Sequence, residues 1–171
     1  LKMKNIYLIG YRATGKSTVS NIIKEKLGKE VIHMDDELIK KIGEIGKFVS
    51  INGWDAFRDE ESKLLKEISK KNNIIIDCGG GIIVRDKNIE LIKKTGICFW
   101  LKASASTIAK RLKSDKKIIR PSLTQTKSTI DEIKEVLNKR IPLYEKTSNY
   151  QIDTENKSIG KITDEIMELL K

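Results

Sequence analysis

The sequence predicts an α/β protein whose central sheet is parallel and covered by helices on both faces. Apolar runs of strand length alternate with helical periodicity along the whole chain, a pattern typical of such sheets. A glycine-containing segment, residues 10–17, separates the first expected strand from the first expected helix. The chain has 171 residues, of which 39% are hydrophobic, enough for one compact core. We therefore expect a single domain over residues 1–171.

Five segments have the length and composition of strands. They read NIYLIG, EVIHM, NIIIDC, ICFWLKA and YQIDT, at residues 5–10, 30–34, 73–78, 97–103 and 150–154. Connections between parallel strands of one sheet are right-handed. Ligands of such sheets gather beyond the carboxyl ends of the strands. We therefore expect a five-stranded parallel sheet with its functional residues at that edge.

Seven segments have the periodicity of amphipathic helices. They lie at residues 17–28, 36–43, 54–71, 86–96, 104–114, 128–146 and 158–171. The polar stretch 114–128 is long for a connection in so small a domain. Connections of that length are typically functional lids or disordered segments.

Composition and charge argue against several classes of function. No run of about 18 apolar residues occurs, so we expect no membrane span. The net charge of +10 is dispersed among glutamates, and aromatic residues make up only 5% of the chain, whereas stacking on bases needs aromatic residues among the basic ones. We therefore expect no nucleic acid partner. The charge indicates a soluble lysine-rich surface or, alternatively, a field that steers anionic small-molecule substrates. We also expect a monomer. Cys78 and Cys98 each lie in an apolar run, which indicates buried, reduced thiols and a cytoplasmic protein.

The segment GYRATGKS, residues 10–17, fits the pattern G-x-x-x-x-G-K-[ST] at every fixed position. In this motif, the P-loop, backbone N–H groups and a helix N-terminus surround phosphate oxygens. We expect Lys16 to reach the β- and γ-phosphates and the Ser17 hydroxyl to bind Mg²⁺. The predicted nucleotide-binding residues of this segment are Gly10, Ala13, Thr14, Gly15, Lys16, Ser17 and Thr18.

The class of P-loop protein follows from two further features. The tetrapeptide N-K-x-D, with which small GTPases recognise their base, does not occur in the sequence. The small size and the irregular segment 114–128 favour a kinase of small molecules. Such an enzyme closes a lid before the reaction, because water would otherwise accept the phosphoryl group.

Four short clusters follow the P-loop. They are G-x-x-x-F-R at Gly53–Arg58, G-G-G at 79–81, R-P-x-L at 120–123 and R-x-P-L-Y at 140–144. Each alone has an ordinary explanation, such as a surface ion pair, a tight turn or a favourable charge at a helix C-terminus. Their occurrence together, in this order, indicates a functional site.

With the P-loop, these clusters resemble the shikimate kinase family over essentially the whole chain. The resemblance also includes an aspartate at the start of the helix after the second strand. It implies the three-layer fold of nucleoside monophosphate kinases, with a mobile lid at about 114–128 and a substrate-binding helical segment at about 35–64. It implies transfer of the γ-phosphate of ATP to the 3-hydroxyl of shikimate, assisted by Mg²⁺, in the pathway to chorismate and aromatic amino acids.

The resemblance also implies roles for substrate-binding residues. Asp36 would hydrogen-bond the substrate hydroxyls and act as a base or orienter. Arg58 and Arg140 would hold the shikimate carboxylate, to which the planar guanidinium group is suited. Backbone atoms of Gly80 and Gly81 would contact a substrate hydroxyl.

Three nucleotide-binding roles are implied in the same way. Arg120, in the lid, would swing onto the phosphates and stabilise charge during transfer, which makes it catalytic together with Lys16. Arg111 resembles the arginine that stacks on adenine, although its spacing to Arg120 is unusual. Asp153 opens the segment that corresponds to the adenine-contacting loop.

The sequence departs from the family pattern after the second strand. Many members have Asp-x-Asp there, and aligning Asp36 with the second aspartate places Met34 at the first, which contacts Mg²⁺ through water. A thioether cannot replace a carboxylate around Mg²⁺. We hypothesise that Asp77, at the end of the third strand, supplies this outer-shell carboxylate; the alternative is an aspartate bonded to local backbone N–H groups. Ala13 also replaces a glycine that is common in this P-loop.

The neighbours of Asp36 are interpreted more simply. Asp35 is expected to cap the helix or face solvent, with a role near Mg²⁺ if the strand end is shifted by one residue. His33, the only histidine, is expected to pack or titrate at the strand end.

Two alternatives remain open from the sequence. A related kinase of gluconate or of a nucleoside monophosphate would share the P-loop, and two arginines do not exclude it. An ATP-binding module with weak catalysis is suggested only by Met34. The glycine triplet with R-x-P-L-Y favours shikimate.

Overall fold

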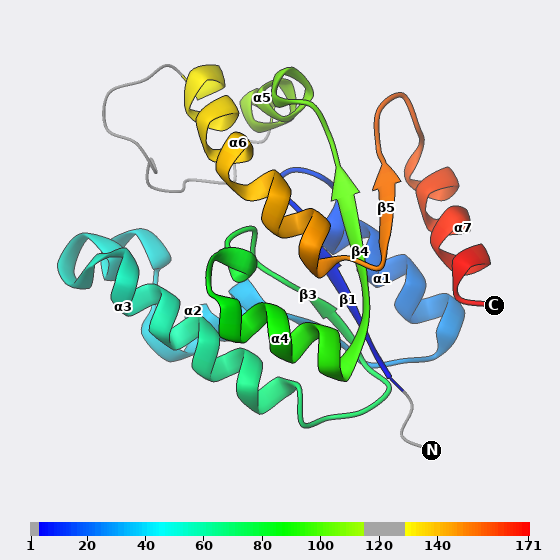
Figure 1. The fold of residues 1–171 in the computed structure, drawn as a ribbon, viewed down its shortest axis with the longest axis horizontal. Helices are drawn as coiled ribbons and strands as arrows, with labels where there is room; N and C mark the ends of the chain where they lie inside the picture. The colour runs from blue at the N-terminus through cyan, green and yellow to red at the C-terminus, as the bar shows by residue number, and fades with distance from the viewer. Residues whose placement is uncertain (1–3, 115–128) are drawn as a thin grey trace.

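The structure, a computed structural model, describes residues 4–114 and 129–171. Its five strands form one sheet in the order β2-β3-β1-β4-β5, and every neighbouring pair is parallel (Figure 1). The strands are β1 (Asn5–Ile9), β2 (Val31–His33), β3 (Ile75–Asp77), β4 (Gly96–Lys102) and β5 (Tyr150–Asp153). The predicted α/β fold with a five-stranded parallel sheet is confirmed.

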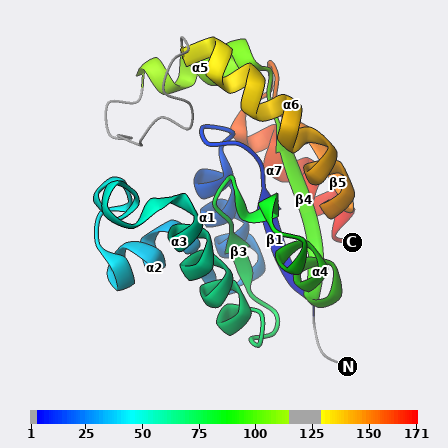
Figure 2. The ribbon, with the colours of Figure 1, turned by 60° about the vertical axis from the view of Figure 1, so that its left-hand side comes forward.

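The helices of the described residues cover both faces of this sheet (Figures 1 and 2). They are α1 (Lys16–Leu27), α2 (Met34–Ile42), α3 (Ile45–Ile68), the 3₁₀ turn η1 (Ile82–Val84), α4 (Asp86–Thr95), α5 (Ala105–Ser114), α6 (Thr129–Thr147) and α7 (Ile159–Leu169). No helix in the described ranges is both long and apolar enough to cross a membrane.

Two hydrophobic clusters bury the two faces of the sheet. Side chains alternate between the faces along each strand. Ile6 and Leu8 of β1 pack with Val19 of α1 and with residues of α7. Tyr7 and Ile9, the alternate residues, join the larger cluster with α3, α4 and α6. Because both faces are covered, the central strands β1, β3 and β4 are mostly apolar and buried, whereas three of the four residues of the edge strand β5 are exposed.

The strand order determines where a ligand can bind. From β1 the chain connects to β2, at one edge of the sheet. From β3 it passes β1 and connects to β4, toward the opposite edge. The chain therefore changes direction around the carboxyl ends of β1 and β3, and such a switch point forms a crevice for ligands. The P-loop, which connects β1 to α1, lies at this edge.

Element boundaries differ from the predictions at two places that matter for the site. Strand β2 ends at His33, and Met34 is already the first residue of α2. Helix α3 begins at Ile45, although only residues 54–71 were predicted to be helical. Gly53 interrupts it with non-helical angles (φ 86°, ψ 166°). The backbone therefore turns at the start of the predicted helix, a conformation that glycine adopts at little cost.

Candidate active site

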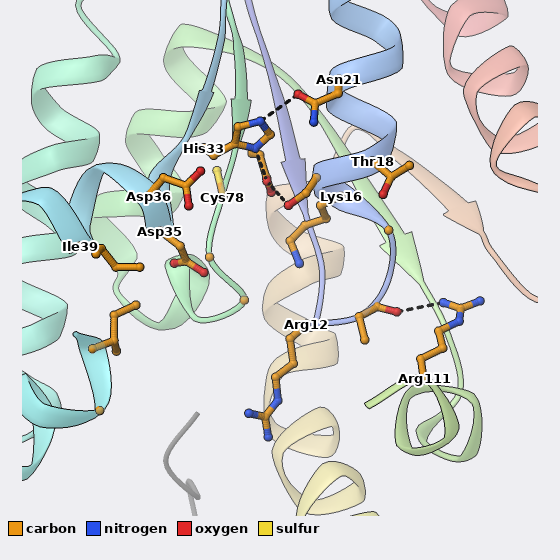
Figure 3. Close-up of a pocket in the computed structure, with 18 of the residues that line it drawn as sticks. Arg12, Lys16, Thr18, Asn21, His33, Asp35, Asp36, Ile39, Cys78 and Arg111 are labelled. Carbon is orange, nitrogen blue, oxygen red and sulfur yellow. Dashed lines mark hydrogen bonds and ion pairs between the residues drawn. The ribbon is translucent and has the colours of Figure 1, made fainter. Parts of the chain in front are cut away.

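A cleft of about 760 Å³ lies beyond the carboxyl ends of the central strands (Figure 3). The P-loop forms one wall, and the strand ends with the first turn of α2 form the other. Of the predicted nucleotide-binding residues, those that line the cleft are Ala13, Gly15, Lys16, Ser17, Thr18 and Arg111. Gly10 and Thr14 belong to the loop but do not line the cleft. The Thr14 hydroxyl donates to the Tyr11 carbonyl oxygen (2.8 Å).

The P-loop takes a conformation that few residues tolerate. Gly10 (φ 144°), Ala13 (φ 63°) and Gly15 (φ 93°) all have positive φ. A Cβ atom on Gly10 would also collide with the backbone of β4. Ala13, the residue that departs from the family pattern, adopts the left-handed conformation nevertheless, at a cost of about 1–2 kcal/mol. Lys16 is buried, and its Nζ donates to the carbonyl oxygens of Gly10 (2.8 Å) and Tyr11 (2.9 Å).

A hydrogen-bonded chain links the P-loop helix to the ends of β2 and β3. The Ser17 hydroxyl donates to Oδ2 of Asp77 (2.7 Å), and Nδ1 of His33 contacts the same oxygen (2.8 Å). Nε2 of His33 contacts Oδ1 of Asn21 (2.9 Å). Figure 3 shows the hydrogen bond between the His33 ring and Asn21. The hydrogen bond to Asp77 raises the pKa of His33.

The structure corrects the interpretation of Met34. Its side chain is fully buried in the larger hydrophobic cluster, because Met34 lies on the core-facing side of α2. The strand-end residue that faces the P-loop helix is His33. His33, and not Met34, is therefore the residue beside Asp77.

The two aspartates of α2 occupy different environments. Asp35 is half-buried, and its Oδ1 lies near Gly79, 3.1 Å from where a Cβ atom on that glycine would stand. Asp36 is exposed and borders only the cleft. Figure 3 shows Asp35 and Asp36 side by side at the start of α2. The structure therefore places Asp35, and not Asp36, beside the second pocket described next.

This second pocket, the acceptor niche, opens from the cleft and encloses about 40 Å³. That space suits a group such as a carboxylate, although not a whole substrate. It contains both arginines that the sequence predicted to bind an anion. The residues that line it are Tyr11, Arg12, Asp35, Ile45, Trp54, Phe57, Arg58, Glu61, Gly79, Gly80, Gly81 and Arg140.

Arg58 is held in the niche by its own helix. Its Nη1 donates to Oε1 of Glu61 (2.8 Å), one turn further along α3. Its guanidinium group also lies 5.3 Å from the ring centres of Trp54 and Phe57. Glu61 is only 1% exposed, and burial raises the pKa of its carboxyl group, an effect that Arg58 partly offsets.

The glycine triplet makes room for both arginines. A Cβ atom on Gly81 would collide with the guanidinium group of Arg58, and one on Gly80 would stand 3.5 Å from Nη1 of Arg140. The hydroxyl of Tyr144 donates to the Gly80 carbonyl oxygen (2.6 Å), and burial raises the pKa of Tyr144 to about 12. Residues 140 and 144 are one helical turn apart. R-x-P-L-Y therefore places a cation in the niche and fixes α6 to the triplet.

The remaining predicted residues lie around the nucleotide side. Nη1 of Arg111 donates to the carbonyl oxygen of Ala13 (3.1 Å) and to the hydroxyl of Thr154 (3.3 Å). Arg111 therefore connects the P-loop to the segment after β5. Asp153 is exposed and borders a separate cavity rather than the cleft. Arg120, and all of the predicted lid except residue 114, lie outside the described residues.

Sequence reasoning missed two charged residues that line the acceptor niche. Glu61 follows Arg58 by three residues, a spacing that brings side chains together on a helix, so it could have been found. Arg12 occupies a variable position of the P-loop motif, and no pattern marks it. It lines both the cleft and the niche, and its buried Nε has no hydrogen-bond partner among the described residues.

Comparison with known proteins agrees with this geometry. The family model for shikimate kinase matches residues 12–171. A shikimate kinase from Thermodesulfovibrio yellowstonii is 40% identical over 166 residues, which are 96% of this chain and 94% of that protein. One from Caldicellulosiruptor bescii is 38% identical over 154 residues, or 90% of this chain and 87% of that protein.

Solved structures lead to the same family. The shikimate kinase from Acinetobacter baumannii in complex with shikimate superposes with a TM-score of 0.89 at 30% identity. The match covers 98% of this chain and 93% of that one. A family model that spans nearly the whole chain, together with relatives at this identity, establishes the relationship. The chain belongs to the shikimate kinase family.

Proposed function

We propose that the chain transfers the γ-phosphoryl group of ATP to the 3-hydroxyl of shikimate. Membership of the family supports ATP-dependent phosphorylation of shikimate. The observation that carries the proposal is the junction of the two pockets. The cleft and the niche share five lining residues, and only Asp35 and Arg12 among them are charged. An acceptor whose carboxylate is in the niche would present a hydroxyl to the cleft at this junction.

The niche fits the carboxylate end of a small acid whose hydroxyl groups extend toward the cleft. Arg58 and Arg140 would bind its carboxylate, and backbone N–H groups of Gly80 and Gly81 would bind oxygens close to the chain. Charge-assisted hydrogen bonds contribute about 1.5–3 kcal/mol each. The two arginines could therefore account for much of the selectivity for an anion.

In the cleft, Lys16 would bind the β- and γ-phosphates, and Arg111 would lie toward the adenine side. Lys16 already points along the loop, since its Nζ contacts two P-loop carbonyl oxygens. Lysine binds phosphate as a compact charge with three donors, so phosphate oxygens can become its partners without a change of fold. Arg120 keeps its proposed role on the transferring phosphoryl group through the resemblance alone.

The donor set of the cleft fits Mg²⁺. Ser17 and Asp77 offer a hydroxyl and a carboxylate, the oxygen ligands that this cation prefers, and their oxygens lie 2.7 Å apart. No group of three or more metal-binding side chains occurs in the described residues, so the nucleotide phosphates would supply the other ligands. Mg²⁺, when bound, neutralises charge on those phosphates.

The residues at the junction would carry the chemistry at the acceptor. Asp35 would accept a hydrogen bond from the 3-hydroxyl, orient its oxygen toward phosphorus and receive its proton. We propose Asp35 for this role in place of Asp36, because Asp35 alone borders the niche. Arg12, opposite Asp35 at the junction, would stabilise negative charge on the transferring group.

The proposal is tested by shikimate-dependent release of ADP, with gluconate and CMP as control acceptors. We expect ADP above background with shikimate only. Turnover of gluconate or CMP without turnover of shikimate would indicate a related kinase. Absence of ADP with all three acceptors would indicate an ATP-binding module.

Gly81→Ala is expected to raise the KM for shikimate about tenfold, since its methyl group would displace Arg58 and lose part of a charge-assisted hydrogen bond. The dissociation constant for ATP should not change. Gly160→Ala in α7 is the matched control, because a Cβ atom there would meet only the Ser158 hydroxyl at 3.9 Å. Equal kinetics for the two variants would show that Gly81 is not needed to position Arg58.

We further propose that the protein acts as a monomer in the cytoplasm, without nucleic acid or membrane partners. The dispersed charge and the few aromatic residues support the absence of a nucleic acid partner. Light scattering after size-exclusion chromatography measures the oligomeric state directly.

A further inference from the structure

Asp77 is buried at the end of β3, yet a histidine and a serine from two other elements bind it. Both hydrogen bonds from described side chains end on the same oxygen, Oδ2. Oδ1 is the carboxylate oxygen left for a ligand of the cleft, which Asp77 also lines. The direction of Oδ1 therefore depends on what holds Oδ2.

His33 is itself fixed on both sides. One ring nitrogen binds Asp77 (2.8 Å), and the other binds Oδ1 of Asn21 (2.9 Å). Asn21 and Ser17 are one turn apart on α1, so they lie on the same face of that helix. The four side chains connect the helix after the P-loop to the ends of two strands (Figure 3). In such a network, loss of one member changes the orientation of the others.

The pairing register makes positions 33 and 77 equivalent in space. His33 and Asp77 are direct partners in the parallel ladder between β2 and β3. Side chains of direct partners project from the same face of the sheet. A carboxylate on β2 at position 33 would therefore reach the same region, beside Ser17, that the carboxylate on β3 reaches now.

We propose that His33 is a positioning residue for Asp77, and that the site needs one carboxylate at either of these two paired positions. His33, held by Asn21, keeps Oδ2 of Asp77 beside Ser17 and turns Oδ1 toward the cation that accompanies the nucleotide. This inference rests on the proposed function, because it assigns the pair to the binding of the nucleotide with Mg²⁺.

The proposal makes a specific prediction about combined substitutions. His33→Asp alone places two carboxylates within hydrogen-bond distance, and their repulsion disfavours the charged state of both. Asp77→Ser alone leaves the pair without a carboxylate. The double variant H33D/D77S has one carboxylate again, at the other position, with a hydroxyl beside it. Its effect should therefore be much smaller than the product of the two single effects.

Calorimetry of ADP binding at increasing Mg²⁺ concentration tests this without any turnover. We expect each single variant to need about tenfold more Mg²⁺ for half-maximal ADP affinity, the change expected from losing one charge-assisted hydrogen bond. The double variant should return to within about threefold of the parent protein. Asp164→Ser, which removes an exposed carboxylate paired with Lys26, is the matched control and should leave the Mg²⁺ requirement unchanged.

A second pair of variants keeps the test valid if the double variant does not fold. His33→Asn retains a donor for Asp77 and should stay near the parent value, whereas His33→Leu should resemble Asp77→Ser. Single effects that multiply in the double variant, or equal results for His33→Asn and His33→Leu, would overturn the proposal. Because shikimate is absent from these measurements, failure of the proposed function appears separately, as a lack of shikimate-dependent ADP release.

Discussion

Asp35→Asn should lower kcat about 100- to 10,000-fold, the usual range for loss of a group that transfers a proton. Asparagine keeps the size of the side chain and can still contact the hydroxyl, but it cannot receive the proton. The KM for shikimate should therefore change much less than kcat. Steady-state kinetics with ATP and shikimate varied separately measures both parameters.

Asp36→Asn is the matched control, since Asp36 is the next residue of the same helical turn and is exposed. Both residues lie in the first turn of α2, so either substitution removes a similar favourable interaction with the helix dipole. We expect Asp36→Asn to leave kcat nearly unchanged, because Asp36 does not line the niche. A large loss in Asp36→Asn with a small loss in Asp35→Asn would return the catalytic role to Asp36.

Arg58→Ala should weaken shikimate binding about 10- to 150-fold, which corresponds to the loss of a charge-assisted interaction of about 1.5–3 kcal/mol. ATP binding should be retained, because Arg58 lines the niche and not the cleft. The substitution also leaves the buried carboxyl group of Glu61 without its partner, and its pKa should rise further. Calorimetric titration with each ligand separately distinguishes the two sites.

Two further variants sharpen this result. Arg58→Lys keeps the charge but not the planar pair of donors, and we expect an intermediate loss of shikimate affinity. Arg85→Ala is the control, since Arg85 pairs with the exposed Asp59 beside the same helix and lines neither pocket. If Arg58→Ala lowered ATP affinity as much as shikimate affinity, the niche would not be the acceptor site.

The sequence predicts the fold well because hydrophobic periodicity determines it. The predicted strand segments contain runs of apolar residues. The glycines of the P-loop motif allow the positive φ angles that the loop needs. The clusters around Arg58, Gly81 and Arg140 were identified as one site, and the structure brings all three into the niche. Residues far apart in sequence could be grouped only because each belongs to a short motif.

The predicted boundary between the second strand and the next helix was misplaced by one residue. β2 ends at His33, and Met34, the first residue of α2, packs in the core. Asp35, in the same helical turn, lines the niche. The periodicity predicted no helix over residues 45–53, because that stretch lacks a clear pattern, and only the resemblance implied a helical segment there. Arg12 has no motif of its own, and only three-dimensional proximity identifies it.

A crystal structure with shikimate and ADP is the most direct test of the site. The shikimate carboxylate should lie between Arg58 and Arg140, with the 3-hydroxyl within about 3 Å of Asp35, the distance of a hydrogen bond. Shikimate bound with its 3-hydroxyl on Asp36, or with its carboxylate outside the niche, would contradict this arrangement.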